Sequence, residues 1–427
     1  MSRSGSVVVI GGGVVGCFIA LNAARAGLKV RLLERGAADD RGCSFGNAGM
    51  VVPSHIAPLP APGMVGAGLR MLANPRGPFA IRPRPDRDLL SWLNAFRRFC
   101  THAHTERCMP ILRDLHRAAQ LIYSEHKSEW PQMQLRESGL LMLCATERGF
   151  EEEARAAARA NELGVTAEVL SAAEADAKLG SCRFRGAGAA WFRDDCTLSP
   201  EGLMRELRAA AEQAGVVTSY GAGVDAIEAR GVGVTGVRIG GETLPADSVV
   251  LAAGSWSAGL LRPLGIRLLL QAGKGCSFTL PEASRLPAVG AILTEARVAV
   301  TPMGSGVRFA GTMEIAGLDP RVNQRRAAGM RSRIPRYFPQ YRAGDFVGLP
   351  VWSGLRPCTP DGLPVIGRCS SLPNLIVATG HAMMGISLAP ITARLVTQLL
   401  RDEPPEQNIA PFAVERFESA STPAVLA

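Results

Sequence analysis

"SVVVIGGGVVGCFIALNAARAGLKVRLLERG", residues 6–36, is the stretch of sequence that decides the fold. The β-branched run 7–10 predicts a buried parallel strand, the alanine-rich segment 14–26 predicts an apolar helix, and the run 29–33 predicts a second strand. Strand, helix and strand in this order form one βαβ unit. The sequence therefore predicts an α/β protein that contains a Rossmann-like, doubly wound domain.

Three glycines at the start of this helix form the pattern GxGxxG: Gly11, Gly13 and Gly16. The first allows a tight turn, the second lets the backbone approach a pyrophosphate, and the third lets the helix pack on the strand. Glu34 follows the second strand, where its carboxylate can accept hydrogen bonds from a ribose diol. A carboxylate there disfavours a 2′-phosphate, so the pattern favours FAD or NAD over NADP.

Size and composition narrow the class of protein. The 427 residues suffice for two or three domains, and 47% hydrophobic with 20% charged residues is typical of a globular chain. The net charge of +9 comes without a long basic run, so nucleic acid is not expected as a partner. The ten cysteines show no CxxC pair and no ligand spacing with histidine, so we expect reduced thiols, no metal and a cytoplasmic protein. Glycines interrupt the apolar N-terminal stretch, which is therefore not expected to span a membrane.

The rest of the chain divides into segments of two domains. Helices are predicted over residues 86–130, 147–163, 171–179, 200–214 and 389–400, and residues 266–315 alternate like antiparallel strands. We expect a discontinuous FAD-binding domain from 1–55, 197–256 and 345–427. A second, α+β substrate domain, built on an antiparallel sheet, is expected from 56–196 and 257–344. Within it, residues 56–85 are rich in Pro and Gly and lack acidic residues, which predicts a loop over a helical turn or two.

Three further segments distinguish FAD from NAD. "SVVLAAGSWS" (248–257) is similar to a second strand-turn signature of FAD enzymes, and "RGCSFGNAGMVVPSH" (41–55) follows at the distance where such enzymes run chain under the flavin. "ATGHAMMGISLAP" (378–390) is a glycine turn before a helix, whose positive dipole end near Gly385 can face the N1–C2=O region of a flavin. In this order along one chain, they favour FAD.

From residue 7 to about residue 400, the chain resembles the superfamily of FAD-dependent D-amino-acid oxidases and dehydrogenases, which also holds glycine and sarcosine oxidases. "SFGNAGMVVPSH" and "GLRPCTPDGLPVIG" most resemble bacterial D-amino-acid dehydrogenases of the D-hydroxyproline dehydrogenase type. The resemblance implies dehydrogenation of a D-amino or cyclic imino acid, such as cis-4-hydroxy-D-proline or D-proline, by hydride transfer from Cα to flavin N5. Two alternatives stay open: an oxygen-using glycine or sarcosine oxidase, and a flavin-binding subunit of a larger dehydrogenase complex.

The resemblance also implies an electron acceptor and a location. A quinone or another respiratory carrier is the acceptor expected for the dehydrogenase branch. The basic, apolar segment 56–85 could rest on an anionic membrane surface, which would make the protein peripheral at the inner face of the membrane.

Arg356 is the first candidate catalytic residue, in the turn-rich stretch "SGLRPCTPDGLPVIG" (353–367). The resemblance places it as the partner of the substrate carboxylate, and a planar guanidinium suits two-pronged carboxylate recognition. The alternative is a structural salt bridge to Asp361, which we expect to cap its own turn. His381 and His55 are the other candidates. His381 either donates to flavin or substrate or satisfies backbone groups, and His55 either lines the substrate entrance or is solvated.

Lys274 and Cys358 need a separate interpretation. Lys274 is predicted to lie on a strand. Either this strand faces the site, or Lys274 is an ordinary surface lysine. Cys358 does not fall on the position used by the covalent flavoproteins of the superfamily, so the FAD is predicted to be non-covalent. The residues expected to bind it are Gly11, Gly13, Val14, Val15, Gly16, Glu34, Arg35, Ser44, Asn47, Ala48, Gly49, Met50, Val224, Ala253, Gly254, Trp256, Gly380, Met383, Met384, Gly385 and Ile386.

Overall fold

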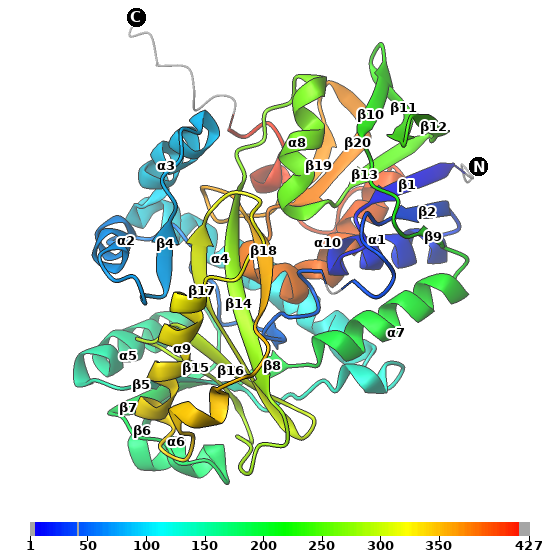
Figure 1. Ribbon diagram of the computed structural model, residues 1–427. Coiled ribbons are helices and arrows are strands. Elements are labelled where there is room, and N and C mark those ends of the chain that lie inside the picture. Colours follow the sequence, from blue (N-terminus) through cyan, green and yellow to red (C-terminus); the bar gives the residue numbers. More distant parts are fainter. Residues whose placement is uncertain (1–4, 41, 418–427) are drawn as a thin grey trace, which may run out of the picture.

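The computed structural model describes residues 5–40 and 42–417 and contains the predicted βαβ unit within a six-stranded sheet (Figure 1). The strand order is β19-β20-β13-β1-β2-β9. Their bounds are β1 Ser6–Ile10, β2 Lys29–Leu33, β9 Val217–Ser219, β13 Ser248–Leu251, β19 Val365–Cys369 and β20 Leu372–Thr379. All neighbours are parallel except β19 and β20, which are antiparallel. The carboxyl ends of the parallel strands therefore meet at one edge of the sheet.

The two faces of this sheet pack in different cores, because the side chains of β1 alternate between them. Val7 and Val9 point into a core shared with α1, α4, α7 and α10, whereas Val8 and Ile10 point into a second core. The helix bounds are α1 Val14–Arg25, α4 His102–Glu125, α7 Pro200–Gln213 and α10 Gly385–Leu400.

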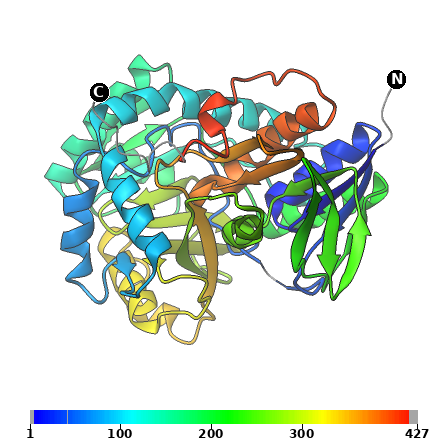
Figure 2. The same ribbon diagram turned by 90° about the horizontal axis from the view of Figure 1, so that it is seen from above.

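The other face carries a small antiparallel sheet, with bounds β10 Ala226–Arg230, β11 Gly233–Ile239 and β12 Glu242–Pro245, and the short helix α8 Ser257–Leu261. Figure 2 shows these three green strands beside the first, blue part of the chain. The domain is thus Rossmann-like, with the longer helices on one face and the small sheet with α8 on the other.

A second, nine-stranded sheet forms the other half of the molecule, in the order β18-β14-β17-β16-β15-β5-β7-β6, with β4 beside β17. Most neighbours are antiparallel, as predicted, and β5–β15 and β4–β17 are parallel. The bounds are β4 Phe79–Ile81, β5 Leu140–Cys144, β6 Ala167–Ser171, β7 Gly188–Phe192, β14 Gln271–Leu280, β15 Gly290–Leu293, β16 Val298–Met303, β17 Gly306–Ile315 and β18 Trp352–Cys358. A separate pair joins β3 Met50–Val51 to β8 Cys196–Thr197.

One face of the nine-stranded sheet packs on helix α9, Gln324–Tyr337, and the other is left for the site. Leu141, Leu143 and Phe309 lie in the core with α9. Met142 and Ala310, one position along the same strands, line a cavity. Because side chains along a strand point alternately to its two sides, one face of the sheet is covered by α9 and the other, open face lines the cavity.

The predicted domain boundaries differ from the packing at three places. Strand β18 was assigned with the FAD-binding segments, but it pairs with β14 in the second sheet. Helix α4 was assigned to the substrate domain, but it packs against α10 in the core of the first. Helix α8 was also assigned to the substrate domain, but it packs in the second core of the first sheet. All three differences come from long-range packing, which sequence order does not show. Residues 1–4 and 418–427 of the predicted FAD-binding domain lie outside the described residues.

The remaining helices follow the predicted pattern more closely. Residues 56–85, expected to form a loop over a helical turn or two, contain helix α2 and also the short strand β4, and Figure 1 shows them with α3 at the side of the second sheet. The bounds are α2 Met64–Leu72, α3 Arg87–Phe99, α5 Glu147–Glu162 and α6 Ala172–Leu179. Short 3-10 turns occupy Pro131–Met133, Gly254–Trp256, Arg262–Leu264, Ala343–Phe346, Ala382–Met384 and Ala410–Phe412. In the described ranges, Ala382–Leu400 is the one helix long and apolar enough to span a membrane, and its α10 part is a core helix.

Candidate functional site

A cavity of about 1140 Å³ lies where the two sheets meet. One wall is made by the loops that follow β1, β2, β13 and β20, which reach the same edge because these strands are parallel. The opposite wall is the open face of the second sheet, with α2 and α3 along the side. Open α/β sheets bind ligands at the carboxyl ends of their strands, so this cavity is the candidate site.

The glycine loop leaves no space for side chains. Gly11 has a φ of +110°, and a Cβ there would lie 2.5 Å from the carbonyl oxygen of Ala252. A Cβ on Gly16 would lie 1.9 Å from the carbonyl oxygen of Gly11. The first glycine thus makes the turn and the third seats the helix on the loop, as the pattern predicted.

The N-terminus of α1 is open to an anion. Its N-cap is Gly13, which supplies no side chain, and its first turn has no acidic residue. Ser44 accepts a hydrogen bond from the Val14 amide over 2.9 Å. Gly13, Val14 and Val15 line the cavity, so the positive end of the helix dipole faces it.

Glu34 holds the glycine loop in position. One carboxylate oxygen accepts from the Gly12 amide over 2.7 Å, and the other accepts from the Gly36 amide over 2.8 Å. Glu34 also lines the cavity, where its remaining lone pairs can meet ribose hydroxyls. The guanidinium of Arg35 stacks on the ring of Trp256, 3.5 Å from its centroid. Glycine loop, helix end and carboxylate together fit the pyrophosphate and ribose of FAD.

The start of α10 faces the same cavity from β20. Gly385 and Ile386 open the helix and line the cavity, and its first turn has no acidic residue. Tyr123 fixes this turn by donating to the carbonyl oxygen of Ile386 over 2.7 Å. The positive dipole end of α10 is therefore available to an electron-rich ring, as predicted for the flavin.

Arg356 lies in strand β18, not in the predicted turn, and it lines the cavity. Its Nη1 donates to the carbonyl oxygen of Thr312 over 2.7 Å. Asp361 instead pairs with Arg416 at 2.8 Å, so the alternative of an Arg356–Asp361 salt bridge is wrong. Asp361 does cap its own turn, since it accepts from the Leu363 amide over 3.2 Å. Within the described ranges no acidic side chain pairs with Arg356.

Gly275 makes the room that Arg356 occupies. A Cβ on Gly275 would lie 2.1–2.6 Å from the guanidinium atoms of Arg356. Gly275 pairs with Gly354 and sits at a bulge between β14 and β17, where the register shifts between Lys274 and Cys276. The guanidinium can thus lie across the sheet face because the facing strand has no side chain there.

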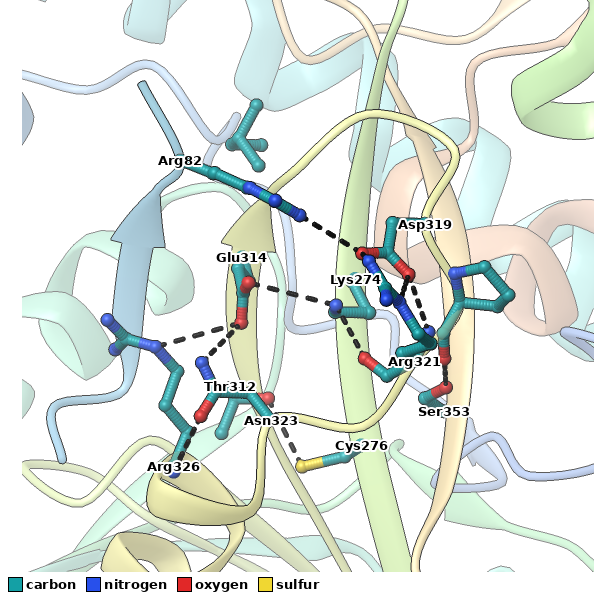
Figure 3. Close-up of polar contacts among 12 residues, drawn as sticks. Arg82, Lys274, Cys276, Thr312, Glu314, Asp319, Arg321, Asn323, Arg326 and Ser353 are labelled. Carbon is teal, nitrogen blue, oxygen red and sulfur yellow. Dashed lines mark hydrogen bonds and ion pairs between the residues drawn. The ribbon is translucent and has the colours of Figure 1, made fainter. Parts of the chain in front are cut away.

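Lys274 belongs to a buried polar cluster behind this bulge (Figure 3). Its Nζ donates to the carbonyl oxygen of Arg321 over 2.7 Å and lies 3.7 Å from the Glu314 carboxylate. Glu314 also accepts from Asn323 over 3.2 Å and lies 3.7 Å from Arg326. Strand β14 faces the cavity through Gly275 and Cys276, as one interpretation expected, but Lys274 itself is only 5% exposed and does not line the cavity. The alternative of an ordinary surface lysine is wrong. The cluster holds together the strands on which Arg356 rests.

His381 and His55 both line the cavity. His381 is buried, and its Nε2 lies 2.9 Å from Oγ1 of Thr392. Nδ1 of His55 lies 3.0 Å from Oγ of Ser54. Burial lowers the pKa of each imidazole to about 4, because the charged form loses its hydration. Both rings are therefore neutral at neutral pH, and His55 is a cavity residue rather than a solvated one.

Most residues predicted to bind the cofactor line the cavity, and three lie behind its wall. Those on the wall are Gly11, Gly13, Val14, Val15, Glu34, Arg35, Ser44, Asn47, Ala48, Met50, Val224, Ala253, Gly254, Trp256, Met383, Met384, Gly385 and Ile386. Gly16, Gly49 and Gly380 do not line it. A Cβ on them would meet Gly11 O, Leu198 O and Thr359 Cγ2 respectively, so these glycines serve close packing.

Sequence reasoning missed several cavity residues. Gly12 lies inside the glycine motif, so the motif itself could have indicated it as a cavity residue whose amide is a hydrogen-bond donor near the start of the helix. The roles of Gly275 and Thr312 could not be predicted from the sequence, because they depend on which strands pair with one another in the sheet. Cys43 also lines the cavity, whereas Cys358 is fully buried with its sulfur packed toward Gly273.

Comparisons with known proteins agree with this geometry. The family model "DAO: FAD dependent oxidoreductase" matches residues 6–399. The chain is 33% identical to the D-amino acid dehydrogenase of Cereibacter sphaeroides (strain ATCC 17029 / ATH 2.4.9), over 96% of this chain and 95% of the relative. It is 32% identical to the D-amino acid dehydrogenase of Bradyrhizobium diazoefficiens, over 96% of this chain and 98% of the relative.

Two solved structures share the fold. Glycine oxidase from Geobacillus kaustophilus has a TM-score of 0.77 at 23% identity, covering 96% of this chain and 99% of that one. L-proline dehydrogenase from P. horikoshii has a TM-score of 0.73 at 17% identity, covering 98% and 99%. At these identities the likeness shows the fold alone.

Proposed function

The chain belongs to the DAO family of FAD-dependent oxidoreductases, and from this premise we propose that it dehydrogenates a D-amino acid or a cyclic imino acid. We propose cis-4-hydroxy-D-proline and D-proline as its first substrates. The observation that carries the proposal is Arg356, a cation on the cavity wall that no acidic side chain of the described residues neutralises. Every α-amino acid offers it a carboxylate.

Arg356 binds and orients the substrate in this proposal. Its Nη1 is held by the carbonyl oxygen of Thr312, which leaves the other donors of the guanidinium fork for the substrate carboxylate. FAD, when bound, supplies the acceptor for the hydride that leaves Cα. The rings of His55 and His381 are neutral at neutral pH, so neither adds a positive charge to the wall near the substrate carboxylate.

The open face of the second sheet favours a small apolar side chain. Met142, Ile292, Ala299 and Ala310 line the cavity from four neighbouring strands. These four side chains form an apolar stretch of wall, which suits a pyrrolidine ring better than an acidic or basic side chain. The printed names of the relatives, D-amino acid dehydrogenases, support the D configuration.

Helix α2 supports the proposal of a quinone acceptor at a membrane. None of its residues is buried, Leu69 is 64% exposed, and Leu69 and Leu72 also line the cavity. Arg70 and Arg76 are exposed on and just after this helix. An apolar helix with nearby arginines suits peripheral contact with an anionic lipid surface, and it would bring a quinone to the cavity.

A screen of D- and L-amino acids tests the proposed function. We expect D-proline and cis-4-hydroxy-D-proline to reduce an artificial dye or a quinone at least about tenfold faster than their L-enantiomers, a difference of about 1.4 kcal/mol in activation free energy. Oxygen should replace the dye only slowly. The measurement is initial rate with and without oxygen.

The other outcomes identify the rivals. Oxygen turnover as fast as dye turnover, with glycine or sarcosine as the preferred substrate, would show an oxidase. Bound flavin that no amino acid reduces, with any acceptor, would show a flavin-binding subunit and contradict the proposal.

Replacing Glu34 tests the FAD site and the proposal that the flavin is non-covalent. Glu34→Ala removes the acceptor for two loop amides and for the ribose, at about 1.5–3 kcal/mol per charge-assisted hydrogen bond. We expect the variant to lose FAD on gel filtration, whereas the parent keeps it. The measurement is the ratio of flavin to protein absorbance.

Glu34→Gln serves as the control, because it keeps one acceptor oxygen and should lose less FAD. Acid should release all flavin from the parent. Flavin that remained on the denatured chain would point to Cys43, the thiol on the cavity wall, rather than to Cys358.

A further inference from the structure

A line of hydrogen bonds leads from the cavity wall to a buried carboxyl group. His55 lines the cavity, and its Nδ1 lies 3.0 Å from Oγ of Ser54. The Ser54 hydroxyl donates to Oδ2 of Asp195 over 2.5 Å, and the Ser54 amide donates to Oδ1 over 2.9 Å. Asp195 has no exposed surface, and none of the described residues forms a salt bridge with it.

Neutral donors alone stabilise an ionised carboxylate poorly in the protein interior. Burial raises the pKa of Asp195 to about 7, and the charge of Asp194 acts in the same direction. Asp195 can therefore both lose and accept a proton near neutral pH. The titratable groups that interact around it are Asp194 and Cys196 on its own segment, His55 on the facing loop and, through His55, His116 on α4.

His55 is suited to pass a proton on rather than to keep it. Burial lowers its pKa to about 4, and His116 is close enough that a charge on either ring disfavours a charge on the other. His116 is fully buried and engaged through Nδ1 with Oγ of Ser387 over 2.8 Å. A proton that reaches His55 from the cavity is thus more stable on Asp195.

We propose that His55, Ser54 and Asp195 form a proton relay that deprotonates the ammonium group of the bound substrate. The relay rests on the proposed function, because an amino acid enters as a zwitterion and its nitrogen needs a free lone pair before hydride leaves Cα. Of the three residues, only His55 reaches the cavity, and Ser54 and Asp195 are positioning residues that act through it.

The proton transfer is balanced without any electron transfer. An ammonium N–H bond breaks as a proton binds Nε2 of His55, the Nδ1 proton moves to Oγ of Ser54, and the hydroxyl proton moves to Oδ2 of Asp195. The substrate becomes a neutral amine, and the carboxylate of Asp195 becomes a carboxylic acid. The imidazole and the hydroxyl end neutral, each with its hydrogen bond reversed.

The test measures the limiting rate of anaerobic flavin reduction by D-proline against pH, in the parent and in Asp195→Asn. In the parent, the rate should fall as the pH drops through about 7, because protonated Asp195 cannot accept a proton. Asp195→Asn should lose this dependence and react about 10²-fold more slowly at neutral pH, with half-saturation nearly unchanged. An amide can still accept from the Ser54 amide, so the loop keeps that contact.

Three further variants separate a relay from a structural role. Ser54→Ala should reproduce the loss, and it keeps the test open if Asp195→Asn does not fold, whereas Ser54→Thr should restore the rate. Asp194→Asn, the matched control, should keep the pH dependence and shift it to lower pH, because Asp194 raises the pKa of Asp195.

Thermal unfolding gives a readout independent of activity. The pKa of Asp195 is raised from 3.8 to about 7 in the folded protein. Asp195 therefore adds to the free energy of unfolding below pH 3.8, and this contribution is lost as the pH rises to about 7. Asp195→Asn should flatten this slope. If the parent is active and Asp195→Asn keeps the pH dependence, the relay alone is wrong. If no amino acid reduces the parent flavin, the proposed function falls and the relay falls with it.

Discussion

Arg356→Ala should weaken substrate binding by roughly thirty- to several-thousand-fold, because removing one partner of a desolvated, hydrogen-bonded charge pair costs about 2–5 kcal/mol. The guanidinium lies on the cavity wall, and the carbonyl of Thr312 holds only one of its nitrogens. Its loss also misplaces Cα, so the limiting rate of flavin reduction should fall as well. The measurement is anaerobic flavin bleaching over a series of substrate concentrations.

Two controls assign this loss to the carboxylate. Arg356→Lys should recover only part of the affinity, because an ammonium is a point charge and cannot form the two-pronged contact. Amines without a carboxylate should bind the parent and Arg356→Ala about equally weakly. If Arg356→Ala bleaches with parental half-saturation and rate, the arginine is structural and the substrate class loses its main support.

Gly275→Ala should lower the same affinity about 10- to 100-fold without removing any group that touches the substrate. A Cβ at this position would lie 2.1 Å from Nη2 of Arg356 and 2.3 Å from its Cζ, so the guanidinium must move aside by an ångström or so. A displacement of about 1 Å costs up to about 10²-fold in well-positioned sites. The measurement is the half-saturation for D-proline.

Gly367→Ala is the matched control, because Gly367 also lies in a strand and a Cβ there meets no atom within 4 Å. The double variant Gly275→Ala/Arg356→Ala should be no worse than Arg356→Ala alone, since the glycine acts through the arginine. Additive losses in the double variant would show that Gly275 supports the sheet and not the guanidinium.

The cofactor half of the site could be predicted largely from the sequence. The strand 7–10, the glycines from Gly11 to Gly16 and the acid Glu34 lie close together along the chain, and their conformations follow from local rules. A turn with φ near +110° needs glycine at Gly11, and Gly16 must also be glycine because a Cβ there would lie 1.9 Å from the carbonyl oxygen of Gly11. FAD followed from the same local signals and from resemblance.

The substrate half could be predicted only in part. The alternation of residues 266–315 indicated antiparallel strands, but it did not show which strands would be neighbours. Arg356 was expected in a turn because prolines and glycines surround it, yet pairing with β14 makes it part of a strand. Local propensity is overridden here by sheet hydrogen bonds to residues far away in the sequence.

By itself, the sequence determined that this protein contains a βαβ dinucleotide site and carries Arg356 as a candidate for carboxylate binding. Only the tertiary structure decided that Gly275 gives that arginine its space, that Lys274 serves a buried cluster, and that His55 connects through Ser54 to Asp195. The physical reason is that turns and helix starts are fixed by neighbouring residues. The space, charge and hydrogen bonds around a buried side chain are set by segments that meet only in the folded chain.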